Sequence, residues 1–211
     1  MNMEYEKNEN LSSNQMKPSS LNYESWLKTE FEQNFDHLRD RDSKFIEIIK
    51  FYATLVLGVV TASIALMGIK NLNHAFALVG LLLIATCFVG EICLLWMIAF
   101  RRYFVTSARQ VNAIRHLYAE NIPGEYQGCV LQSTDPSQPP LLHKGSAHIT
   151  MMRIITFVNA TLATIGTLGI MSYVTQIKSW QRISVIIAIF LIVITVNTLY
   201  IRKKLKEKKE D

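Results

Sequence analysis

Four long apolar runs constrain the fold of this chain more than any other feature. They lie at residues 51–69, 75–100, 154–177 and 183–201, and the only charged side chain in any of them is Glu91. A bilayer core about 30 Å thick needs about 20 mostly apolar residues per helix, and each run meets or approaches that length. The sequence therefore predicts an all-α integral membrane protein, with four transmembrane helices in two hairpins and a helical cytosolic stalk.

The basic residues predict how these helices are oriented. Only three of the 22 lysines and arginines lie in the short turns at 70–74 and 178–182, whereas six lie in the C-terminal stretch 202–211. Positively charged segments stay in the cytosol, so we expect a multi-pass protein of the cell (inner) membrane with both termini cytosolic. The lipid bilayer is then its first partner. No nucleic-acid partner is expected, because topology already accounts for the net charge of +5.

Composition and periodicity divide the chain into seven expected segments. They are a disordered N-terminal tail (1–21), an amphipathic cytosolic helix (22–50), transmembrane hairpin 1 (51–100), a cytosolic extension helix (101–122), a cytosolic loop (123–150), transmembrane hairpin 2 (151–201) and a basic cytosolic tail (202–211). Neither proline nor glycine separates the two cytosolic helices from the adjoining spans, so each is expected to continue its span without a break, the first either straight or with a bend near Asp40–Ser43. Twenty further residues would carry a helix about 30 Å beyond the bilayer.

Apolar side chains recur at helical spacing in both cytosolic helices, which predicts two stripes that must be covered. The expected stalk interface consists of Phe31, Phe35, Phe104, Val111 and Ile114, and the expected basic face consists of Arg102, Arg109 and Arg115. Packing of the two helices on each other, within one subunit or between subunits of a homo-oligomer, is the first interpretation. A helix on the membrane surface and a docking site for a soluble cytosolic partner protein are the alternatives.

Three polar side chains within the apolar runs are candidates for function: Glu91, Asn159 and Asn197. An ionised acid at the middle of a transmembrane helix costs about 3 kcal/mol to insert. Counting ten residues back from Arg101 puts Glu91 about 15 Å from the inner end of its helix, near the middle of the bilayer. A hydrogen bond to Asn159 that fixes helix register is one interpretation. Conduction of ions or protons, and an incidental acid, are the others.

Small residues in the third run indicate close helix approach. They are Ala160, Ala163, Gly166 and Gly169. The approach could lie within the bundle or between subunits.

Enzyme signatures are missing from the sequence. It contains no P-loop, GxSxG, HExxH or paired-carboxylate motif, and its three cysteines show neither CxxC nor Cys/His metal spacing. We therefore expect no enzyme activity, no cofactor and no metal.

The junction "FRRYFVTSARQVNAIRHLY" resembles a loose group of uncharacterised prokaryotic four-helix membrane proteins, in which a span continues into a cytosolic helix. The residues that carry the likeness are Arg102, Phe104, Arg109, Gln110, Asn112, Ile114 and Arg115. Over about residues 25–120 the layout is also similar to the SMODS- and SLOG-associating two-transmembrane effector domains. The second hairpin of this chain has no counterpart in those domains, because they have two spans.

That resemblance implies a sensor or effector component in prokaryotic defence, one that breaches the membrane when activated. A small ion or proton channel or transporter that uses Glu91 is an alternative function. A membrane scaffold that recruits a soluble partner is another.

Overall fold

The computed structural model describes residues 20–68, 74–120, 135–143, 145–173 and 179–206. The tail expected at 1–21, much of the loop expected at 123–150 and the last five residues of the basic tail therefore lie largely outside the described residues, as does Cys129. Four helices make up most of the described part: α1 (Ser20–Met67), α2 (Ala75–Glu120), α3 (Ala147–Tyr173) and α4 (Ser179–Leu205). The described residues form no strand.

Each of the four helices is long and apolar enough to cross a membrane. The prediction of an all-helical chain with four candidate spans is confirmed at this level.

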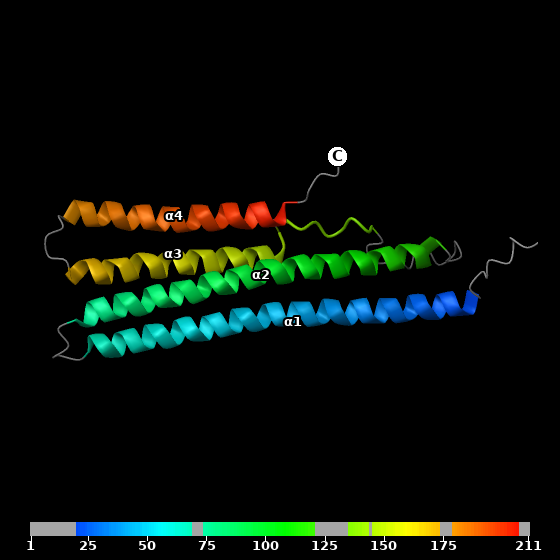
Figure 1. Cartoon of the computed structure of the whole chain (residues 1–211), viewed down its shortest axis with the longest axis horizontal. Coiled ribbons are helices and arrows are strands. Elements are labelled where there is room, and N and C mark those ends of the chain that lie inside the picture. The colour runs from blue at the N-terminus through cyan, green and yellow to red at the C-terminus, as the bar shows by residue number, and fades with distance from the viewer. Residues whose placement is uncertain (1–19, 69–73, 121–134, 144, 174–178, 207–211) are drawn as a thin grey trace, which may run out of the picture.

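Helices α1 and α2 are much longer than the other two. They contain 48 and 46 residues, against 27 in each of α3 and α4. Figure 1 shows α1 and α2 continuing side by side beyond the ends of the shorter helices. We call α1 residues 20–50 and α2 residues 101–120 the stalk; it consists of this projecting part and the short stretch of both helices that packs on the start of α3. The helices stay continuous there because neither segment contains a proline or glycine, the residues that most readily break a helix.

Helices that are consecutive in the sequence pack on each other: α1 on α2, α2 on α3 and α3 on α4 (Figure 1). The α2–α3 contact is as extensive as the α1–α2 contact, so the two expected hairpins are joined along their length. Helix α4 packs mainly on α3. Only 6% of the most apolar stretch of α4 is buried within the chain, against 39% for α2, so most of the apolar surface of α4 is exposed.

Glycines allow the close approach of α2 and α3. A Cβ atom on Gly80 would lie 2.5 Å from the carbonyl oxygen of Gly166, and one on Gly169 would lie 2.6 Å from that of Phe76. These contacts are with backbone atoms, which cannot rotate out of the way. The small residues Gly166 and Gly169 of the third run thus pack within the chain rather than between subunits.

The largest fully buried side chains lie where α1, α2 and α3 meet near the stalk. They include Phe45, Leu94, Met97, Ile149 and Met152. Leu141 and Leu142, from the segment before α3, pack against the same core. This tight region lies at the base of the stalk, between the two polar clusters described below.

Candidate functional site

One polar side chain from each helix meets in what we call the four-helix cluster. Asn159 of α3 donates from Nδ2 to Oε1 of Glu91 on α2 over 2.9 Å. Asn197 of α4 donates to the same oxygen over 2.8 Å. The Tyr52 hydroxyl of α1 donates to Oδ1 of Asn159. A single chain of hydrogen bonds therefore links all four helices.

Asn159 is the centre of this cluster. Its side chain is fully buried, with 0% of its surface exposed. Its oxygen accepts from a hydroxyl and its nitrogen donates to a carboxyl oxygen, so the orientation of the amide is determined. A Cβ atom on Gly90 would lie 2.0 Å from Asn159 Oδ1, so the glycine provides the space for the amide. Because an unpaired buried polar group is costly, the cluster favours one register of the four helices.

All three polar residues singled out in the apolar runs, Glu91, Asn159 and Asn197, meet in this cluster. The Glu91–Asn159 hydrogen bond that was one interpretation of the sequence is present. Tyr52 was missed. It is one of several aromatic residues in or near the apolar runs, and only its position opposite Asn159 distinguishes it.

The distance from the cluster to the nearest charged residue differs between α1 and α2: Glu91 is ten residues from Arg101 along α2, but the α1 member of the cluster is much closer to a charge. Tyr52 lies only two residues beyond Lys50, the last charged residue of α1 in this direction. Arg41 of the stalk lies over the ring of Phe100, 6.0 Å from its centroid. The end of the apolar run in α2 thus lies beside the charged part of α1. This arises because the 26-residue run at 75–100 makes a helix longer than the bilayer core is thick.

Glu91 and Asn197 also line a cavity of about 370 Å³ between α2, α3 and α4. Its other lining residues are mostly apolar: Ile84, Cys87, Phe88, Ala163, Thr167, Ile192, Val193 and Val196. The carboxyl group therefore lies at the edge of a largely apolar space.

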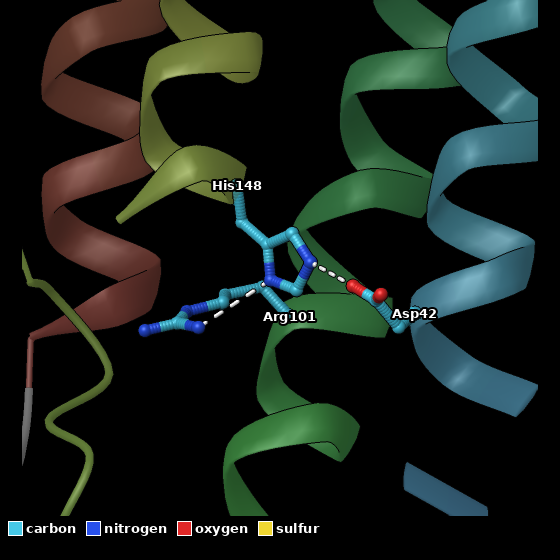
Figure 2. Close-up of polar contacts among 3 residues, drawn as sticks. All are labelled: Asp42, Arg101 and His148. Atoms are coloured by element: carbon cyan, nitrogen blue, oxygen red, sulfur yellow. Dashed lines mark hydrogen bonds and ion pairs between the residues drawn. The ribbon is translucent and has the colours of Figure 1, made fainter. Parts of the chain in front are cut away.

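A second polar group, the junction cluster, lies where the stalk meets the bundle (Figure 2). His148 of α3 contacts Asp42 of α1 through Nε2, with 2.9 Å to Oδ1. Arg101 of α2 approaches the other ring nitrogen, with 3.4 Å from Nη1 to Nδ1. His148 and Arg101 are both buried. The histidine ring packs between Phe45 and Phe104, at centroid distances of 4.1 and 4.8 Å.

This geometry fits a neutral His148 that carries its proton on Nε2. Arg101 can only donate, so Nδ1 must accept, and Nε2–H is then free to donate to Asp42. Burial lowers the pKa of His148, the charge of Arg101 lowers it further, and Asp42 acts in the opposite direction. Burial also lowers the pKa of Arg101. No group of three or more His, Cys, Asp or Glu side chains among the described residues is placed to hold a metal ion.

Side chains of α2 hold the segment 135–142, which we call the docked segment, against the stalk. Arg101 donates from Nε to the carbonyl oxygen of Leu141 (3.3 Å) and from Nη2 to that of Pro140 (3.1 Å). Arg109 donates from Nε to the carbonyl oxygen of Pro139 (3.3 Å). Asn112 donates from Nδ2 to the carbonyl oxygens of Gln138 (2.9 Å) and Asp135 (3.2 Å). Each donor satisfies a backbone carbonyl that regular secondary structure leaves unpaired. Arg101 thus joins the docked segment to the junction cluster.

The five expected stalk-interface residues have different surroundings. Val111 is buried, Ile114 is half-buried, and Phe104 contacts His148. Phe31 carries the guanidinium of Arg115 over its ring at 5.6 Å. Phe35 stacks on Phe31 but stays 37% exposed. One expected interface residue is therefore not covered within the chain.

The three arginines of the expected basic face are not gathered on one surface. Arg102 is exposed, Arg109 binds the docked segment, and Arg115 packs on Phe31. Burial lowers the pKa of Arg115. Two of the three contribute to packing within the chain.

Comparisons of the chain with known protein families, with curated proteins and with solved structures found no match. Function is therefore inferred from the geometry of the two clusters and the stalk.

Proposed function

We propose that the chain is a non-enzymatic multi-pass protein of the cell membrane that acts as a sensor or effector component, with its stalk in the cytosol. A change at the stalk passes to the transmembrane helices. The observation that supports this most is the continuity of α1 and α2, which run from the stalk into the bundle as single helices. The sequence resemblance favours a setting in prokaryotic defence.

Continuous helices can transmit a shift or rotation because their backbone hydrogen bonds keep them stiff. Transitions of this kind commonly move helices by 1–2 Å at their interfaces. The junction cluster joins α1 and α2 to the start of α3. The four-helix cluster, ten residues further along α1 and α2, joins both helices to α3 and α4. A movement of α1 and α2 in the stalk would therefore be transmitted to α3 and α4 through the hydrogen bonds of these two clusters.

Tryptophan fluorescence tests this transmission. Replacing Trp26 and Trp180 with phenylalanine leaves Trp96, an exposed residue of α2, as the reporter within the bundle. Val111→Asp puts a charge into the buried face of the stalk, whereas Gln110→Asp puts the same charge on its exposed face. In liposomes with brominated lipid, we expect quenching of Trp96 to change in the Val111 variant and to stay unchanged in the Gln110 variant.

A second background that keeps only Trp26 reports on the stalk itself. If Val111→Asp alters Trp26 fluorescence while Trp96 quenching remains as in the parent, the stalk moves without the bundle. That result would contradict the proposal.

An ion or proton channel is the second candidate, because Glu91 lines a cavity between three helices. Flux in reconstituted liposomes tests it, with Glu91→Gln as the variant that cannot ionise. Flux in the parent that disappears in a stably folded Glu91→Gln protein would favour the channel. We expect no such flux, since the described cavity is mainly apolar and Glu91 is bound by two amides.

A further inference from the structure

A pocket of about 460 Å³ lies between the stalk-side ends of α3 and α4. The residues that line it are Leu142, Ile149, Arg153, Thr198, Ile201 and Arg202. Ile149 and Ile201 are buried, whereas Arg153 and Arg202 are exposed. The pocket therefore combines an apolar base with two guanidinium groups, one from each helix. None of the described residues that line it is acidic.

The pocket lies at the level expected for lipid headgroups. Arg153 is six residues from Asn159 and Arg202 is five residues from Asn197, which is about 8 Å from the four-helix cluster toward the stalk. Lys50 begins the charged part of α1 on the same side of that cluster. Exposed Tyr200 lies at the same level along α4, three residues beyond Asn197. Tyrosine and tryptophan are enriched at the boundary between membrane and water.

We propose that this pocket binds the phosphate of an anionic phospholipid from the leaflet that faces the stalk. Guanidinium groups bind phosphate through paired hydrogen bonds, and the Thr198 hydroxyl can donate a further one. Basic pockets between transmembrane helices on the cytoplasmic side commonly take such headgroups.

Apolar surface for the acyl chains adjoins the pocket on its membrane side. Phe157 lies one turn along α3 from Arg153, is 58% exposed, and contacts Phe190 of α4 edge to face at 5.7 Å. Free phosphate would use the arginines and leave this surface uncovered, so a lipid fits the site better. A bound lipid would bridge α4, the least buried helix, to α3 and to Leu142 of the docked segment. The inference depends on the membrane placement in the proposed function and not on signal transmission.

The experiment measures lipid binding to the full chain in a non-ionic detergent. Native mass spectrometry compares phosphatidylglycerol with phosphatidylcholine, and thermal unfolding is followed as each lipid is added. We expect phosphatidylglycerol to bind more tightly and to raise the melting temperature. Arg153→Gln and Arg202→Gln should each weaken it about fivefold, which corresponds to about 1 kcal/mol per basic residue near an anionic surface.

Lys203→Gln is the matched control, because Lys203 is exposed on the same turn as Arg202 and does not line the pocket. It should keep parental affinity. The proposal would be overturned if Lys203→Gln lost as much affinity for phosphatidylglycerol as the arginine variants do. It would also be overturned if the parent bound the two lipids equally well, or if inorganic phosphate alone raised the melting temperature as much as phosphatidylglycerol does. The comparison of lipids on the parent needs no variant, so it holds even if an arginine variant folds poorly. Trp96 quenching tests signal transmission separately.

Discussion

Oxygen Oε1 of Glu91 accepts hydrogen bonds from two asparagines on different helices. An interhelical hydrogen bond in a membrane contributes roughly 0.6–2 kcal/mol, and replacing an acceptor leaves its donors unpaired. The position therefore depends on an acceptor rather than on a charge. This distinguishes packing from conduction, because glutamine supplies the acceptor but cannot ionise.

We expect Glu91→Gln to keep parental stability and Glu91→Leu to lose roughly 1–3 kcal/mol, since leucine leaves both amides without their acceptor. Thermal or denaturant unfolding in detergent measures the difference. If Glu91→Leu is as stable as Glu91→Gln, the cluster does not hold the helices together.

His148 predicts a dependence of stability on pH. Burial, aided by Arg101, lowers its pKa in the folded state below the ordinary value of 6.5, with Asp42 opposing the shift. As the pH falls below about 6.5 the unfolded chain takes up a proton that the folded chain does not, so stability decreases. Above that pH both states are neutral at this residue and its contribution is complete. Unfolding measured between pH 7.5 and pH 5.5 should show this loss.

Two histidine variants separate this effect from general acid sensitivity. His148→Gln, which cannot take up a proton, should reduce the loss between those two pH values. His143→Gln, at an exposed position, should leave it unchanged. An undiminished loss in His148→Gln would assign the acid sensitivity to other groups.

Among the helices, the α2–α3 contact depends most on the absence of side chains. At Gly80 an added Cβ atom would lie 2.5 Å from a backbone oxygen, whereas at Gly58 of α1 nothing lies within 4 Å. Gly80→Ala should therefore destabilise the protein by roughly 1–3 kcal/mol, the usual cost of overpacking. Gly58→Ala should be neutral or stabilising by up to about 1 kcal/mol, because alanine favours a helix. Similar melting temperatures for the two variants would mean that α2 and α3 separate easily.

At the scale of the whole molecule, we propose that surfaces left uncovered within the chain are sites of assembly with further copies. Phe35 in the stalk is 37% exposed although it belongs to an apolar stripe. We expect Phe35→Asp to reduce the oligomer mass in detergent while membrane insertion is retained. Gln33→Asp adds the same charge at an exposed position nearby and should have no effect. Light scattering coupled to size exclusion measures both, and an unchanged mass in Phe35→Asp would exclude this surface from assembly.

The distribution of basic residues predicts the topology of the molecule. In a cysteine-free background, a membrane-impermeant maleimide should label Trp180→Cys in intact cells. Lys206→Cys should be labelled only after permeabilisation, because it follows the basic end of α4. Labelling of Lys206→Cys in intact cells would reverse the orientation and place the stalk outside.

The sequence by itself determined the number of candidate spans and the continuity of the two long helices. Both properties are local. An uncharged run of about 20 residues is suited to a bilayer whatever its neighbours are, and a stretch without proline or glycine has no residue that breaks it. The pairing of Glu91 with Asn159 was also accessible, because polar groups in apolar surroundings seek each other.

Only the tertiary structure decided which polar groups meet and which turns of neighbouring helices lie side by side. Tyr52 and His148 gain their partners from residues more than 100 positions away along the chain, and no local pattern distinguishes them. Likewise, the run in α2 has no internal marker of which part of α1 lies beside it, so the pairing of Tyr52 with the Glu91 cluster followed only once the helices packed. Register between helices depends on glycine contacts and buried hydrogen bonds between distant segments, and these form only when the helices pack.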